Sequence, residues 1–206
     1  MGLEYLSSLV RRTWQEKGRE AVDGSADDTE LAYLARLAKN PSVRLIGEIG
    51  FNGGFSSYNF LAANPHTHVY SFDLCEYNHV IPAKQHIDET FPGRHTLILG
   101  NSIQTVPKFL REHPQLRFDL IFIDGGHDYE IAMADLINMR ALATTNTILV
   151  TDDLTPWLPW GEGPTRAWQE ILRDGLVIQE ELIKDGVVVT TIEPPGERCW
   201  VVGRYT

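Results

Sequence analysis

Three aspartates stand where two apolar runs end. Asp124 closes the run at 118–124, and Asp152 and Asp153 follow the run at 146–151. If the runs are neighbouring strands, the three carboxyl groups converge and raise one another's pKa unless a cation lies among them. Mg²⁺ takes oxygen ligands and leaves room for substrate oxygens. The spacing predicts a magnesium site on these aspartates; the alternative is that the pair caps a loop and Asp124 only orders a cofactor.

His127 follows Asp124 by three residues, in a Gly-Gly turn that leads into a predicted helix at 128–141. Imidazole has an ordinary pKa of about 6.5, so it can take a proton from a substrate hydroxyl. We expect His127, beside Asp124, to be the general base; capping of the helix or a backbone hydrogen bond is the alternative. The remaining histidines lack ligand spacing and are expected at the surface: His66, His68, His79, His86, His95 and His113.

A glycine-rich turn, EIGFNGGFS at 48–56, follows the first apolar run. Glycines let the backbone turn sharply and approach a ligand at the carboxyl end of a strand. Asp73 ends the second strand about 20 residues further on, where a carboxylate can accept hydrogen bonds from both ribose hydroxyls. Asn101 and Ser102 follow the third strand and are placed to face an adenine. The three features predict a ribose-bearing ligand.

The same turn argues against a dinucleotide or ATP. The dinucleotide fingerprint G-x-G-x-x-G would need glycines where this chain has Asn52 and Phe55, and a Walker A motif is absent. NAD and ATP are therefore disfavoured.

Alternating apolar and amphipathic segments indicate the elements that position these residues. Two helices at 3–17 and 27–39 come first, and strands then alternate with helices. Strands are expected at 43–49, 67–72, 95–99, 118–124 and 146–151, and helices at 56–63, 79–90, 102–112, 128–141 and 165–173. Runs at 176–183 and 187–192 flank an Asp185-Gly186 hairpin turn, and a last run spans 199–204.

The pattern predicts an α/β fold: a doubly wound, Rossmann-like, mostly parallel seven-stranded sheet with helices on both faces and a C-terminal antiparallel hairpin. We expect a single domain over 1–206, with N-terminal helices in 1–40 and the core in 43–204.

Composition excludes several classes of function. The net charge of −10, without any basic run, disfavours nucleic acid. Cys75 and Cys199 lack metal or disulfide spacing, which fits a reducing cytoplasm, and no run is long and apolar enough for a membrane helix. We expect a cytoplasmic protein that acts on a small molecule; a homo-oligomer stays open.

The segments EIGFNGGFS, SFD at 71–73, GNS at 100–102 and IDGGHDYE at 123–130 resemble the ordered motifs of class I S-adenosylmethionine methyltransferases. The similarity spans about 43–204 and is closest to metal-dependent small-molecule O-methyltransferases, of the catechol type and the macrolide-sugar type. It implies that 50–56 hold the methionine part of the cofactor, Asp73 its ribose, and Asn101 and Ser102 its adenine. The implied cofactor-binding residues are Glu48, Gly50, Asn52, Gly54, Phe55, Ser56, Asp73, Asn101, Ser102 and Asp124.

The resemblance also places Asp124, Asp152 and Asp153 at the Mg²⁺ ligands, although catechol-type enzymes often carry Asn at the third position and a Lys base where His127 stands. The predicted activity is O-methylation of a secondary metabolite, sugar or phenol. Non-methyl-transfer chemistry on the same fold, or a non-catalytic binding module, are the alternatives.

Four tryptophans complete the expectations. Trp157 and Trp160 follow the acidic pair and form either a substrate wall or a loop packed on the core. Trp14 and Trp168 lie on apolar helix faces and are expected in the core.

Overall fold

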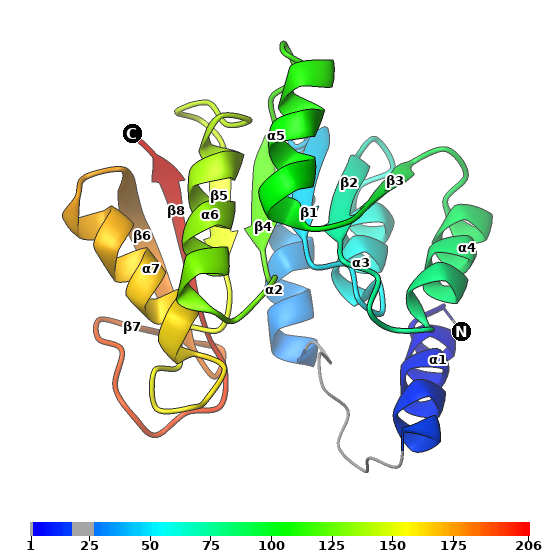
Figure 1. Cartoon of the computed structure of the whole chain (residues 1–206), viewed down its shortest axis with the longest axis horizontal. Coiled ribbons are helices and arrows are strands. Elements are labelled where there is room, and N and C mark those ends of the chain that lie inside the picture. Colours follow the sequence, from blue (N-terminus) through cyan, green and yellow to red (C-terminus); the bar gives the residue numbers. More distant parts are fainter. Residues whose placement is uncertain (1, 18–26) are drawn as a thin grey trace.

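A computed structural model describes residues 2–17 and 27–206 of the chain (Figure 1). Its helices are α1 (Gly2–Glu16), α2 (Asp28–Ala38), α3 (Phe55–Ala63), α4 (Val80–Thr90), α5 (Ser102–Glu112), α6 (Tyr129–Arg140) and α7 (Glu162–Arg173). Its strands are β1 (Leu45–Ile49), β2 (His68–Asp73), β3 (His95–Leu99), β4 (Leu120–Ile123), β5 (Ile148–Thr151), β6 (Val177–Lys184), β7 (Val187–Val189) and β8 (Cys199–Tyr205). These elements fall close to the predicted segments.

The strands form one sheet in the order β3-β2-β1-β4-β5-β8-β6-β7. Strands β1 to β5 pair in parallel, whereas β8 inserts antiparallel between β5 and β6. The order reverses at β1, which pairs with β2 on one side and β4 on the other. In open α/β sheets, ligands bind at such a switch point, outside the carboxyl ends of the strands.

The predicted fold class is confirmed, with one difference in the strand count. The sheet has eight strands rather than seven, because all eight predicted apolar runs join it; the run predicted at 187–192 contributes only Val187–Val189, which pairs with the end of β6 as a short outer strand. The pairing of Lys184 with Val187 confirms the predicted hairpin turn.

Each face of the sheet carries its own apolar core. In β4, Leu120 and Phe122 join the cluster under α1 to α4, whereas Ile121 and Ile123 join the cluster under α5 to α7. Figure 1 shows α5, α6 and α7 in front of the sheet and α2 and α3 behind it. This alternation explains why the parallel strands read as continuous apolar runs: both faces are covered.

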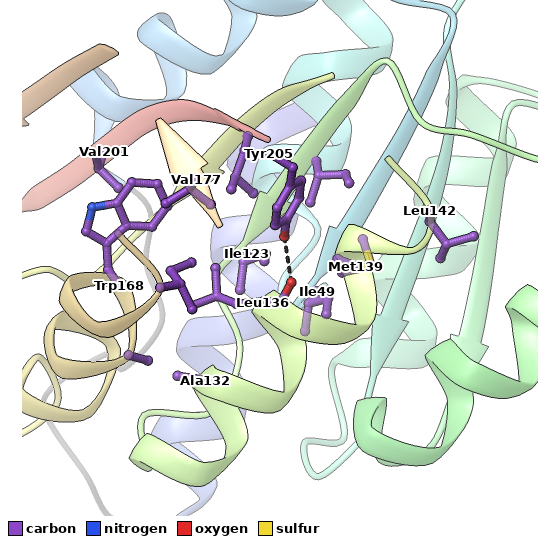
Figure 2. Close-up of a cluster of buried hydrophobic side chains, with 14 of the residues drawn as sticks. Ile49, Ile123, Ala132, Leu136, Met139, Leu142, Trp168, Val177, Val201 and Tyr205 are labelled. Atoms are coloured by element: carbon purple, nitrogen blue, oxygen red, sulfur yellow. Dashed lines mark hydrogen bonds between the residues drawn. The ribbon is translucent and has the colours of Figure 1, made fainter. Parts of the chain in front are cut away.

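The cluster under α5 to α7 includes side chains of the C-terminal strand β8. Figure 2 shows Tyr205 of β8 beside α6, where its hydroxyl donates to the Leu136 carbonyl oxygen at 2.7 Å. Trp168 of α7 is fully buried in the same cluster, and Trp14 of α1 is also buried, as predicted.

None of the helices within 2–17 and 27–206 has the length and apolar composition to cross a membrane.

Asp135 of α6 lies fully buried against this core. Among the described residues, no group makes a well-formed hydrogen bond to either carboxylate oxygen. Burial raises the pKa of Asp135 from 3.8 to about 6, which the Ser102 hydroxyl partly opposes. A carboxyl group with a raised folded-state pKa stabilises the fold only while it is protonated.

We therefore predict that Asp135→Asn stabilises the protein at pH 8 but not at pH 4. Between pH 4 and pH 8 the unfolded wild-type chain binds fewer protons than the folded one. The free energy of unfolding of the wild type therefore falls as the pH rises, by up to about 3 kcal/mol relative to the variant. Urea denaturation at both pH values measures the difference. Glu130→Gln, on the exposed face of α6, is the control. Equal effects of Asp135→Asn at the two pH values would contradict the prediction.

Candidate functional site

The carboxyl ends of β1 to β4 surround a cavity of about 330 Å³. Backbone hydrogen bonds continue the sheet to its rim: the Gly50 amide donates to the Phe72 carbonyl oxygen and the Asp124 amide to that of Ile49, both at 2.9 Å. These bonds hold the ends of β1, β2 and β4 at one level. The volume suits a small organic ligand or cofactor.

Most residues predicted to bind a cofactor line this cavity. They are Gly50, Asn52, Phe55, Ser56, Asp73, Asn101, Ser102 and Asp124, joined by His127. Glu48 and Gly54 are not among the lining residues. Gly54 instead precedes α3 in a left-handed conformation, φ 74°, and Glu48 is buried beneath the turn. Any contribution of these two to cofactor binding is through the shape of the turn.

Asp73 holds the glycine turn against β2. Its Oδ2 accepts hydrogen bonds from the backbone amides of Phe51 and Asn52, at 2.9 and 2.8 Å, and its Oδ1 accepts one from Cys75 at 2.6 Å. The same carboxylate lines the cavity, so it fixes the turn while facing the ligand space.

Glu48 anchors the turn from below. Its carboxylate accepts hydrogen bonds from the hydroxyls of Ser56, Ser57 and Ser71. Burial raises the pKa of Glu48, and the three hydroxyl groups oppose that shift. This network joins β1, β2 and the start of α3 into one rigid support.

Two histidines belong to this support, so the prediction that the remaining histidines lie at the surface is wrong for His79 and His95, which are 2% and 6% exposed. His79 Nε2 lies 2.5 Å from Asn52 Oδ1, and His95 Nε2 lies 2.9 Å from Ser71 Oγ. Burial lowers the pKa of His95 to about 3, which keeps its ring neutral. The one available signal was the place of His95 at the start of an apolar run.

The predicted acidic cluster forms next to the cavity. Asp124, Asp152 and Asp153 each present a carboxylate oxygen, and these atoms lie within 4.8 Å of one another. The parallel pairing of β4 with β5 brings them together, since the Asp152 amide donates to the Ile123 carbonyl oxygen at 3.0 Å. Burial, then the charge of Asp153, raises the pKa of Asp152 to about 7.

The donor set fits a hard divalent cation. Asp152 is 3% exposed, and its Oδ1 has no hydrogen-bond partner among the described residues. A buried carboxylate oxygen without a partner is costly, and a cation among three carboxylates would offset both the desolvation and the repulsion.

His127 faces this cluster rather than the helix behind it. Its Nε2 lies 2.9 Å from Asp153 Oδ2, and its side chain is 43% exposed. Asp128, not His127, is the N-cap residue of α6. This contact orients the imidazole at the edge of the cavity, as a carboxylate does for a catalytic histidine.

Sequence reasoning missed two charged residues of this site. Glu30 of α2 is buried, and after burial itself the charges of Asp152 and Asp124 raise its pKa. Arg198, just before β8, interacts electrostatically with the same carboxyl groups. For Glu30 a signal existed: it shares a helix face with Leu34 and Ala38, where an acid is unexpected.

The two tryptophans of the loop after β5 differ in their surroundings. The Trp157 indole Nε1 donates to the Gly196 carbonyl oxygen at 2.8 Å, and Trp160 is 41% exposed. Trp160 is therefore not a core residue.

A doubly wound sheet with a glycine turn after β1 and an acidic residue ending β2 defines the nucleoside-cofactor-binding class of α/β proteins. Within that class, residues 48–154, just over half of the chain, match the family model described as a methyltransferase domain. The chain belongs to this methyltransferase family, as its motifs predicted. A comparison with curated protein sequences gives no match.

Solved structures share the fold over nearly the whole chain. An O-methyltransferase from Bacillus cereus, in complex with SAH, has 18% identity and a TM-score of 0.74, covering 98% of this chain and 90% of that one. TomG from Streptomyces achromogenes, an O-methyltransferase of tomaymycin synthesis in complex with SAM, has 19% identity and a TM-score of 0.74 over 98% and 89%. CalS11, a TDP-rhamnose 3'-O-methyltransferase of calicheamicin biosynthesis, has 22% identity and a TM-score of 0.62 over 84% and 78%.

The close approach of the glycine turn to β4 gives a prediction for Gly50→Ala. Gly50 has φ 92°, and an added Cβ would lie 1.8 Å from the Asp124 carbonyl oxygen. Strain at a left-handed position costs about 1–3 kcal/mol, and the clash adds to it. We expect a loss of at least about 3 kcal/mol in the free energy of unfolding, measured with urea.

Gly93→Ala is the matched control, because Gly93 also has a positive φ, 70°, but its added Cβ would meet no atom within 4 Å. A loss at Gly50 no larger than that at Gly93 would show that the contact with β4 is dispensable.

Proposed function

We propose that the protein transfers the methyl group of S-adenosylmethionine to the hydroxyl oxygen of a small molecule. Membership of the methyltransferase family supports the transfer itself. The SAH and SAM bound in similar structures support S-adenosylmethionine, and the O-methyltransferase activity of those proteins supports oxygen as the acceptor atom. Two free cysteines support a reducing compartment such as the cytoplasm.

One observation carries the proposal: the cofactor cavity and the acidic cluster share a wall. Asp124 and His127 border both the large cavity and a small recess formed with Asp152 and Asp153. A ligand in the large cavity therefore ends where acidic and basic side chains meet, which is the arrangement that methyl transfer to a hydroxyl needs.

Different residues of the chain then bind the cofactor and remove the proton. Asp73, Asn101 and Ser102 hold the nucleoside end of the cofactor. When bound, S-adenosylmethionine would supply an electrophilic methyl group to the acceptor oxygen and would leave as S-adenosylhomocysteine, and the chain's part is to hold the two in line. His127, oriented by Asp153, takes the hydroxyl proton.

Asp124, Asp152 and Asp153 are the residues that would hold Mg²⁺. When bound, the ion supplies Lewis acidity, which lowers the pKa of an acceptor hydroxyl and orients it.

The cofactor assignment predicts that S-adenosylmethionine binds and NAD does not. We expect Asp73→Ala to weaken S-adenosylmethionine binding at least tenfold, because each lost charge-assisted hydrogen bond contributes roughly 1.5–3 kcal/mol. Calorimetry measures the affinity, and Glu89→Gln, at an exposed acid that does not line the cavity, is the control. Equal affinity of wild type and Asp73→Ala would refute the ribose assignment, and a thermal shift with NAD alone would refute the cofactor.

The cluster assignment predicts separate roles for ligand and base. EDTA and Asp152→Asn should abolish turnover of an accepted phenol or glycoside and leave cofactor binding largely intact. His127→Ala should lower kcat by roughly 10²–10⁴-fold with metal and cofactor binding retained. Release of S-adenosylhomocysteine and the mass of the methylated product report turnover.

His66→Ala, at an exposed histidine remote from the cavity, is the control for His127. Full turnover in EDTA would refute the metal assignment. A product without the added methyl group would instead point to another chemistry on the same fold.

A further inference from the structure

Glu30 is an acid on the buried face of a helix. It is 2% exposed, and it shares that face of α2 with Leu34 and Ala38, which are fully buried. Glutamate is almost never fully buried unless it is paired, because desolvating its charge is costly. The position therefore needs an explanation that apolar packing does not give.

The packing of α2 carries Glu30 to the acidic cluster. The Tyr33 hydroxyl donates a hydrogen bond to the Glu181 carboxylate of β6 at 2.6 Å, and the centroids of the Tyr33 and Trp200 rings lie 5.6 Å apart, so α2 packs on β6 and β8. The chain after β5 runs beside β8, since the Leu154 amide donates to the Cys199 carbonyl oxygen at 2.7 Å. Glu30 lies one helical turn before Tyr33, and this packing therefore turns it toward the start of β8 and the chain just after β5.

There Glu30 comes within electrostatic reach of the cluster. Burial, then the charges of Asp152 and Asp124, raises the pKa of Glu30 well above its ordinary value. The charges of Asp152, Glu30, Asp153 and Asp124 all favour the protonated Arg198 guanidinium and raise its pKa, although its burial opposes them. One guanidinium is thus set against four carboxyl groups.

This balance leaves an excess of negative charge at the acidic cluster. Arg198 offsets one negative charge, and Asp152 Oδ1, buried in the same place, has no hydrogen-bond partner among the described residues. A fourth acid adds repulsion that the fold alone does not require. It does increase the attraction for a divalent cation, and outer-shell partners also orient the ligands they contact.

We infer that Glu30 is an outer-shell residue of the cation site, where it positions Asp152 and adds negative charge, and that Arg198 is the built-in counter-charge that holds the cluster together without a cation. The inference rests on the proposed metal site. It places part of that site on α2, outside the matched segment 48–154.

The test is Glu30→Gln, which keeps the size of the side chain and removes its charge. Electron paramagnetic resonance of Mn²⁺ titrated into the protein, without cofactor or substrate, should show an affinity lowered by roughly 10–100-fold. The Tm of the metal-free variant should equal or exceed that of wild type, since carboxylate repulsion is relieved. A purely structural glutamate would give the reverse: a lower Tm and an unchanged Mn²⁺ affinity.

Two further variants complete the design. Asp28→Asn, at an exposed acid in the same turn of α2, should leave the affinity for Mn²⁺ unchanged. Arg198→Gln should tighten Mn²⁺ binding and lower the metal-free Tm, with Mn²⁺ restoring it.

Equal Mn²⁺ affinity in wild type and Glu30→Gln overturns the inference and leaves the proposed metal site standing. A wild-type protein that binds no Mn²⁺ overturns both, whereas S-adenosylmethionine binding remains an independent measure of the proposed methyl transfer.

Discussion

The parallel pairing of β1 with both β2 and β4 is the constraint on which the rest of the structure depends. It makes β1 the point where the strand order reverses, so the connections leave on opposite faces and a crevice opens at the carboxyl ends. The backbone bonds that continue past the strands bring Gly50 against the Asp124 carbonyl oxygen. The cavity and the acidic cluster are thereby built from one set of strand ends.

Buried acids perform most of the positioning in this molecule. Asp73 uses its carboxylate to shape the glycine turn that it borders, and Glu48 gathers three serine hydroxyls beneath it. Such networks rigidify a site when every member is satisfied. Within the acidic cluster Asp152 is not fully satisfied, because one of its oxygens has no hydrogen-bond partner in the described part of the chain; the same holds for both oxygens of Asp135 in α6. An unsatisfied buried carboxylate at Asp152 destabilises the fold locally, and a ligand bound there can offset that cost.

Asp153, the third aspartate of the cluster, has a role both in the backbone turn after β5 and in the contact with His127. Asp153 has φ 63°, a left-handed conformation that Asp and Asn adopt far more readily than most residues. That conformation turns the chain sharply after β5, and the Asp153 carboxylate lies against His127. The Asn often found at this place in catechol-type enzymes suits the same backbone, whereas the Asp here also supplies a charge beside the imidazole.

The sequence by itself determined the alternation of strands and helices, the glycine turn and the carboxylates after β2, β4 and β5, because apolar periodicity and strand-end position are local properties. It did not determine that β8 separates β5 from the β6–β7 hairpin, nor that Glu30, His79 and Arg198 reach the site. Those depend on which distant surfaces pack together: α2 becomes part of the site only by docking on β6 and β8. The approach of Glu30 to Asp152 depends on that docking, so only the tertiary structure sets it.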